Sequence, residues 1–255
     1  MVSMEAGNYL YLYCIIETGE ERNFGPIGVG GRGDLVTTIN YDDISGVVSR
    51  TPLLKYDLNR ENLLGHQRVV EEVMKEYTVL PVRFCTVAEC AEDIRRVLRK
   101  RYAEFKRLIR EMDNKTELGV KVLWKDIKTV FREIGEGDPE IRRLKGNIAS
   151  RPLKQAYSES IALGRMVQAA LESKKNEVAD NILERLNPIA LDTAINKVHG
   201  DSMILNSAFL VHGGRVKEFD DAIAELESSS NDRMGIKYVG PVAPFNFINI
   251  VVEWR

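Results

Sequence analysis

The order of short apolar runs and longer helical stripes in the second half of the sequence restricts the fold most. Apolar runs of about four to eight residues favour strands, and apolar residues three or four apart favour helices. By these criteria the order is strand 117–124, a short helix to about Ile134, a polar loop 135–147, a helical region 152–186, strands 189–198 and 203–211, a helix marked by Val216, Phe219, Ile223 and Leu226, and strand 234–239.

This order predicts a C-terminal domain of the ferredoxin-like, split βαβ type. Strand, helix, strand, strand, helix, strand is the arrangement of that fold. The turn residues His199-Gly200-Asp201 favour a hairpin between the two middle strands. A last strand over 245–252 is predicted to follow Gly240-Pro241.

The first half also mixes strands and helices, so the whole chain is predicted to be an α+β protein. The predicted elements are strands 8–16, 34–40 and 44–49, a helix with Leu63, His66, Val70 and Val73 on one face, an extended run 78–84, and one long helix 89–112. Pro81 supports the extended run because a proline biases the residue before it away from helix. The polar stretch 113–115 places the boundary between an N-terminal α+β domain, 1–114, and the C-terminal domain, 115–255.

The composition is that of a folded protein without a strong charge preference. Apolar residues make up 44% and charged residues 29% of the 255 residues, as in globular domains. Lys and Arg total 36 against 38 Asp and Glu, so no overall field attracts nucleic acid or an anionic membrane. The start of the sequence lacks a basic leader, and no apolar run reaches the length of a membrane span. An odd number of cysteines argues against a disulfide framework, so we expect a cytoplasmic protein.

The segment TVLPVRFCTVAEC, residues 78–90, raises the question of a reactive cysteine. Arg83 would favour the thiolate of Cys85, because a nearby cation stabilises that form. A nucleophilic cysteine also needs a base, and the three histidines lie far away in the sequence. A small, buried apolar role is therefore the preferred interpretation of Cys85. His66 lies on the apolar stripe of its helix, where a packed, hydrogen-bonded histidine is expected.

Neither a metal site nor a nucleotide site is predicted. Four residues separate Cys85 from Cys90, and no second pair of ligands follows. The glycine-rich GVGGRG, residues 28–33, precedes strand-like residues, whereas a phosphate-binding loop opens a helix. Glycines that supply positive φ in a turn explain this loop. No catalytic residue and no cofactor is predicted.

The helix over 92–111 carries eight cations against four carboxylates. A basic helical face can follow a phosphate backbone, so a nucleic-acid-binding or regulatory module is an alternative function. The interleaved acids and the absence of a stacking motif favour a solvated face over nucleic-acid binding. A third interpretation, intermediate between these two, is that the helix binds an acidic protein partner.

The ending GPVAPFNFINIVVEW, residues 240–254, is stiff and apolar. One interpretation is a final strand that closes the sheet. The other is an edge or apolar surface that a partner occupies.

Several segments together resemble one known family. LPVRFCTVAE, residues 80–89, is similar to the LPxRFGTxF segment of the gas vesicle protein F/L family. The helix with LLGHQRVVEEV precedes it, and YLYCII, GVVS, VKVLW, NSAFLV and GPVAPFNF match in type and order over residues 8–252. Cys85 stands where the family usually has glycine. Val242-Ala243 replaces its usual Trp-Pro, and Phe245 replaces a tyrosine.

This resemblance implies an accessory or minor structural component of gas vesicles, without enzymatic activity. It implies binding to the small, very hydrophobic shell protein and to other accessory proteins during early assembly, in the cytoplasm and at the vesicle, with no cofactor, nucleic acid or membrane involved. It also implies an N-terminal α+β domain and a modified ferredoxin-like C-terminal domain. The residues expected to serve structure or partner contact are His66, Leu80, Pro81, Arg83, Phe84, Gly240, Pro241, Pro244, Phe245 and Phe247.

Overall fold

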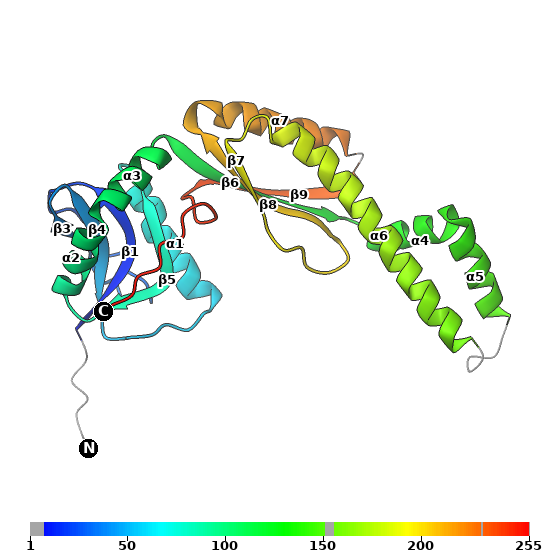
Figure 1. The fold of residues 1–255 in the computed structure, drawn as a ribbon, viewed down its shortest axis with the longest axis horizontal. Coiled ribbons are helices and arrows are strands. Elements are labelled where there is room, and N and C mark those ends of the chain that lie inside the picture. The colour runs from blue at the N-terminus through cyan, green and yellow to red at the C-terminus, as the bar shows by residue number, and fades with distance from the viewer. Residues whose placement is uncertain (1–7, 151–155, 231, 255) are drawn as a thin grey trace, which may run out of the picture. The chain divides into compact units, whose positions relative to one another are not determined.

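The computed structural model describes residues 8–150, 156–230 and 232–254 and shows an α+β protein with two antiparallel sheets (Figure 1). The chain forms two compact units. The first contains the residues up to Glu117 together with those from Pro241 onward, and the second contains Leu118–Gly240. The predicted division at 114/115 had placed the C-terminal residues with the second domain, whereas they pack in the first unit.

The first unit is built on a five-stranded sheet in the order β2-β3-β4-β1-β5. Its strands are β1 Tyr9–Glu17, β2 Asn23–Gly25, β3 Val36–Tyr41, β4 Ile44–Thr51 and β5 Leu80–Ala88. Helices cover both faces, and residues 11–16 of β1 are all buried. A strand buried on both faces reads as one continuous apolar run, which explains why YLYCII lacks polar alternation.

Three helices complete this unit, namely α1 Arg60–Met74, α2 Ala91–Lys100 and α3 Tyr102–Met112. Helix α1 packs on the face of β1 that carries Tyr11 and Tyr13. Helices α2 and α3 pack on the opposite face, against Leu12 and Ile15, as Figure 1 shows.

The prediction of one helix over 89–112 is wrong. Helix α2 ends at Lys100, because the next residue, Arg101, has a φ of −111° and a ψ of 19°, which are not helical. The Arg101 side chain donates to Glu104 at 2.7 and 2.8 Å and to the carbonyl of Val251 at 3.0 Å, and its guanidinium lies over the Phe105 ring. These contacts hold the residue in place at the break between the two helices.

The second unit has a four-stranded sheet in the order β7-β8-β6-β9. Its elements are β6 Lys115–Trp124, α4 Ile127–Gly137, α5 Pro139–Ala149, α6 Tyr157–Leu186, β7 Asp192–Ile195, β8 Met203–His212, the short 3-10 helix η1 Gly213–Arg215, α7 Val216–Ser229 and β9 Met234–Val242. Strand β6 alternates, with Leu118, Val120, Val122 and Trp124 in the core beneath α6 and α7. Strands β6 and β9 contribute residues to both units.

Two predictions about this unit are wrong. The supposed loop 135–147 is mostly helix α5, because Asp138 accepts the N–H groups of Glu140 and Ile141 and Pro139 occupies the first helical position. The predicted strand 189–198 shortens to β7. The start of the predicted helical region, residues 152–155, lies outside the described residues.

The predicted final strand over 245–252 is also not formed. Residues 245–247 make a turn, and the one bridge of this stretch to another described residue is a parallel one between Val82 and Ile250. Residues 241–254, called the tail below, nevertheless contribute Ala243, Ile248 and Ile250 to the core of the first unit. An apolar run that is buried without regular pairing looks like a strand in the sequence.

Candidate functional site

Three of the predicted site residues meet in one aromatic cluster of the first unit. His66 comes from α1, Phe84 from β5 and Phe245 from the tail, and they surround Tyr11 of β1. The ring centroid of His66 lies 5.9 Å from Phe84, 6.0 Å from Phe245 and 5.7 Å from Tyr11. Because Tyr11 belongs to a strand inside the sheet, the cluster ties helix, edge strand and tail together.

Tyr11 is the polar centre of this cluster. Its hydroxyl lies 3.1 Å from Nδ1 of His66 and accepts the backbone N–H of Cys85 at 2.8 Å. Burial raises the pKa of Tyr11 above its ordinary value, so the hydroxyl keeps its proton. Burial also lowers the pKa of His66 to about 4, partly offset by the Val82 backbone, so the ring is neutral near pH 7. A neutral ring accepts a hydrogen bond from Tyr11 at Nδ1.

This geometry stabilises the fold and does not prepare a reaction. A general base needs a pKa near the working pH and access to its substrate. His66 is only 3% exposed, and its pKa is lowered far below neutrality. The expectation of a packed, hydrogen-bonded histidine is confirmed.

Cys85 lies in a bulge of β5. The pairing of β1 with β5 shifts register between Leu12 and Cys14, and Cys85 has a φ of 65°. Its Sγ accepts the backbone N–H of Tyr56 at 3.1 Å. A non-glycine residue in this left-handed region is uncommon, so the backbone explains why a small residue suits this position.

The other predicted site residues of β5 differ in their exposure to solvent. Leu80 and Pro81 are buried, whereas Arg83 projects into solvent. In the tail, Pro244 is buried and Phe247 is half-buried. Gly240 and Pro241 are exposed. Gly240 has a φ of 142°, a conformation that side chains disfavour.

Glu117 anchors the tail and was not singled out from the sequence. Its carboxylate accepts the backbone N–H of Asn246 at 2.7 Å and the side-chain amide of Asn246 at 2.6 Å. The neighbouring Thr116 hydroxyl donates to the carbonyl of Val242 at 3.0 Å. Burial raises the pKa of Glu117, an effect that the Asn246 hydrogen bonds oppose. The partners are 129 residues apart, so no local pattern marks the pair.

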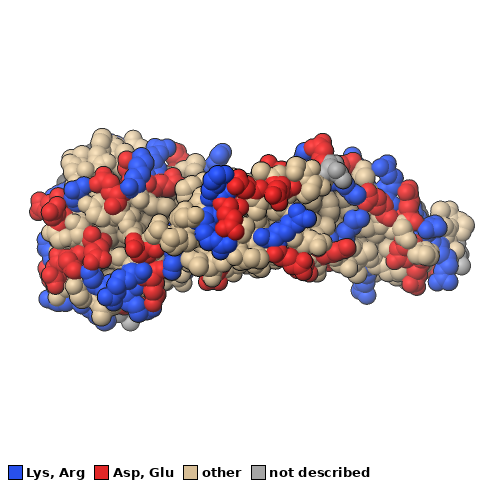
Figure 2. All heavy atoms as spheres, turned by 90° about the horizontal axis from the view of Figure 1, so that it is seen from above, with Lys and Arg blue, Asp and Glu red and all other residues tan. Residues whose placement is uncertain are grey.

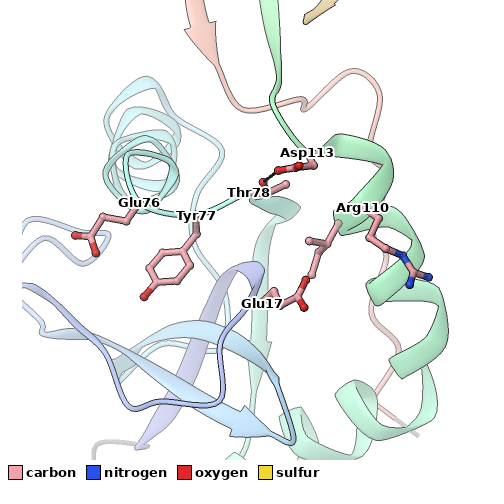
Figure 3. Close-up of a pocket in the computed structure, with 7 residues that line it drawn as sticks. Glu17, Glu76, Tyr77, Thr78, Arg110 and Asp113 are labelled. Atoms are coloured by element: carbon pink, nitrogen blue, oxygen red, sulfur yellow. Dashed lines mark hydrogen bonds between the residues drawn. The ribbon is translucent and has the colours of Figure 1, made fainter. Parts of the chain in front are cut away.

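An open cavity of about 520 Å³ lies between the end of α1 and the end of α3 (Figure 3). Its lining residues are Glu17, Glu76, Tyr77, Thr78, Ile109, Arg110 and Asp113. Each carboxylate already has a partner: Glu17 pairs with Lys106, Glu76 with Arg22, and Asp113 with the Thr78 hydroxyl. The carboxylates that line this cavity are therefore already paired with other groups of the same chain. No group of three or more His, Cys, Asp or Glu side chains within the described ranges is arranged to hold a metal ion.

A second cavity of about 360 Å³ is lined by the glycine-rich loop and by Glu61, Gly65 and Arg68 of α1. Gly30, Gly31 and Gly33 have φ values of 89°, 67° and 74°. The loop leads into strand β3 and not into a helix. The interpretation of these glycines as turn residues is therefore confirmed, and the loop lacks the helix start of a phosphate site.

The sequence of this chain matches the model of one protein family over most of its length. The model of the gas vesicle synthesis proteins GvpL/GvpF matches residues 9–249. The chain belongs to this family.

Relatives of the GvpL/GvpF family match along nearly the whole chain. Gas vesicle protein F1 of Halobacterium salinarum is 27% identical, covering 94% of this chain and 93% of the relative. Gas vesicle protein F of Streptomyces sp. strain CB03234 is 29% identical, covering 88% and 93%. The crystal structure of GvpF from Anabaena sp. PCC7120 has a TM-score of 0.80 at 23% identity, covering 96% of this chain and all of that one, which shows a shared fold.

Membership in the GvpL/GvpF family gives Cys85 a context. The resemblance of LPVRFCTVAE to the family segment implies glycine at this position, and the φ of 65° is one that glycine adopts without strain. Across the described part of the chain, no helix combines the length and apolar character needed to cross a bilayer.

Proposed function

We propose that this protein is a non-enzymatic accessory or minor structural protein of gas vesicles. It binds the small hydrophobic shell protein and other accessory proteins and helps to nucleate or assemble the vesicle, in the cytoplasm and at the vesicle itself. The observation that carries this proposal is the match of the gas vesicle synthesis family over residues 9–249.

The geometry supports a binding role over a chemical one. Tyr11 and Nδ1 of His66 are hydrogen-bonded to each other inside the core, and the thiol of Cys85 accepts a backbone N–H. Among the predicted site residues, His66, Leu80, Pro81 and Pro244 serve packing. Arg83, Gly240 and Pro241 are exposed, and we assign them to partner contact together with the half-buried Phe247.

The second unit fits a modified ferredoxin-like domain. Its sheet order β7-β8-β6-β9 places the first and third strands of the βαββαβ sequence at the centre. Helices α4 and α5 are the additions, because they stand between β6 and the long α6.

The alternative, nucleic-acid binding by the helix over 92–111, has less support. Arg95 and Arg96 of α2 each lie near a carboxylate of the preceding turn, at 3.8 and 3.3 Å. Arg101 and Arg107 are paired with carboxylates of the following turn, Glu104 and Glu111. Cations and acids alternate over the surface in Figure 2, and such a surface offers no continuous track for phosphates.

Co-expression with a gas vesicle shell protein tests the proposal. We expect the shell protein to co-purify with this chain and to stay soluble longer than when expressed alone. Absence of co-purification, together with normal vesicles in cells that lack the chain, would refute the proposed function. A parallel filter-binding measurement with DNA and RNA at rising salt tests the alternative.

A further inference from the structure

The first unit exposes an unusual concentration of leucines. Five exposed leucines fall within residues 53–64, called the leucine segment below, and their exposed fractions are Leu53 44%, Leu54 55%, Leu58 78%, Leu63 42% and Leu64 46%. Single exposed apolar residues are normal, but a group of them marks an interaction surface. Seven other large apolar residues are exposed in the whole described chain, so this segment stands out.

The middle of the leucine segment is fixed to the core, so its leucines are not exposed by fraying. Tyr56 is 5% exposed. Its hydroxyl lies 2.7 Å from the Thr51 hydroxyl and accepts from Arg32 at 2.7 Å, and its N–H donates to Cys85 Sγ. A loop held by a buried tyrosine presents its flanking side chains in a defined arrangement.

The end of the loop is fixed as well. The carbonyl of Asp57 accepts the N–H of Asn59 at 2.9 Å and the side-chain amide of Asn62 at 3.0 Å. Asn59 caps α1 by accepting the N–H of Asn62. Leu58 and Leu63 occupy the two positions of a hydrophobic staple around this cap, yet both stay well exposed. A staple therefore accounts for only part of the exposed leucine surface.

The charges of the segment indicate which partner fits. Lys55 and Arg60 are balanced by Asp57 and Glu61, so the segment carries no net charge. Nucleic acid and anionic membranes are drawn to net positive charge, and this segment offers none. A partner with an uncharged apolar surface matches this segment.

We propose that the leucine segment, with Leu53, Leu54 and Leu58 as its principal contact residues, is the surface on which this protein binds the apolar shell protein of the gas vesicle. This inference rests on the proposed function and adds the place of contact. The segment covers apolar surface of the partner that would otherwise meet water, and the anchored loop lowers the ordering cost of binding.

The test compares two triple variants of the full chain. Leu53→Ser, Leu54→Ser and Leu58→Ser remove three of the five exposed leucines of the leucine segment. The matched control replaces three apolar residues of the second unit that are similarly exposed, Leu191 at 54%, Ile195 at 62% and Val239 at 56%, with serine. Both sets lie at the surface, and circular dichroism and thermal melting establish that each variant is folded.

Binding is measured as the affinity for the detergent-solubilised shell protein by biolayer interferometry and as co-purification from cells. We expect the leucine variant to bind at least tenfold more weakly and the control to bind like the unaltered chain. Equal binding by all three proteins overturns this surface and leaves the proposed function intact. If the unaltered chain does not bind at all, the proposed function fails and this partner fails with it.

Two further measurements test whether the leucine segment binds something other than the shell protein. If light scattering finds a dimer that the leucine variant turns into a monomer, the segment is an interface between copies of this chain. If the unaltered chain floats with phosphatidylcholine and phosphatidylglycerol vesicles and the variant does not, the segment is a lipid contact. Either result overturns the assignment to the shell protein.

Discussion

Two residues at the centre of the first unit are held in states that their residue types do not prefer. His66 is buried as a neutral ring against Tyr11, and Cys85 has a left-handed backbone. Each state is maintained by the surrounding structure and has a free-energy cost that appears in stability measurements.

The first prediction concerns pH. The pKa of His66 is lowered from 6.5 to about 4 in the folded protein, so below pH 6.5 the unfolded chain binds a proton that the folded chain does not. The stability that depends on neutral His66 is therefore fully present above pH 6.5. As the pH falls from 6.5 toward 4, the free energy of unfolding decreases by ~3 kcal/mol. Urea unfolding at pH 7, 6, 5 and 4 measures this slope.

A matched variant isolates the histidine. His66→Gln keeps an acceptor for Tyr11 but does not titrate. We expect its stability to fall less between pH 6.5 and 4 than that of the unaltered chain. Parallel curves for the two proteins would contradict the assignment of this slope to His66.

The second prediction concerns Cys85. Glycine adopts a φ of 65° freely, while a β-branched residue there costs about 1–2 kcal/mol or more. We expect Cys85→Gly to change the free energy of unfolding by less than about 1 kcal/mol, since relief of strain offsets the lost Sγ contact, and Cys85→Val to destabilise clearly. Arg83→Val, at an exposed position of the same strand whose φ is not positive, is the control. A stable Cys85→Val variant would argue against the strained backbone.

At the scale of elements, the sequence pattern predicts those whose apolar spacing matches one buried face. Strand β6 and helix α7 meet this condition, because each presents alternating or helical apolar residues to one core. The sequence pattern does not predict the break between α2 and α3, because Ile94 and Phe105 on its two sides face the same core. Spacing alone does not register a break that leaves the buried face unchanged.

The candidate site shows the same limit. The sequence predicts His66 from the apolar stripe of its helix, and the resemblance to the family implies Phe84 and Phe245 as separate site residues. Their meeting around Tyr11, and the pairing of Glu117 with Asn246, join segments that are far apart in the sequence. Such contacts depend on the fold as a whole, so one sequence without its structure does not reveal them.

The third prediction concerns helix α5. Asp138 caps it by accepting two backbone N–H groups, and loss of such a cap costs about 1 kcal/mol. We expect Asp138→Ala to speed amide hydrogen exchange in α5 roughly fivefold. Asp126 caps α4 in the same manner, so Asp126→Ala should speed exchange in α4 instead. Unchanged exchange in α5 would show that packing, and not the cap, fixes this helix.

At the scale of the whole molecule, both ends of the described chain build the first unit. The tail contributes Ile248 and Ile250 to the core, and these are 6% and 1% exposed. Burying an isoleucine contributes about 1.5–3 kcal/mol, and the two together match a large part of the net stability of an ordinary domain.

The fourth prediction follows from this burial. A chain ending at Gly240 should lose the cooperative melting of the first unit, while the second unit keeps its own transition. As a milder test, Ile250→Ala should cost about 2–4 kcal/mol, whereas Val251→Ala, at a residue 42% exposed, should cost little. Differential scanning calorimetry separates the two transitions. Retention of both transitions in the shortened chain would show that the tail is dispensable.

The split construction of the first unit also fixes a sequence of events during translation. The ribosome makes residues up to Glu117 first, then the whole of Leu118–Gly240, and only then the tail. Domains form as their residues become available, so the second unit reaches its native state before the first, although its residues follow later. Until the tail has been synthesised, the edge of β5 and the aromatic cluster are exposed to solvent in the nascent chain. Chaperones that bind exposed apolar surface therefore act on this protein mainly during that interval.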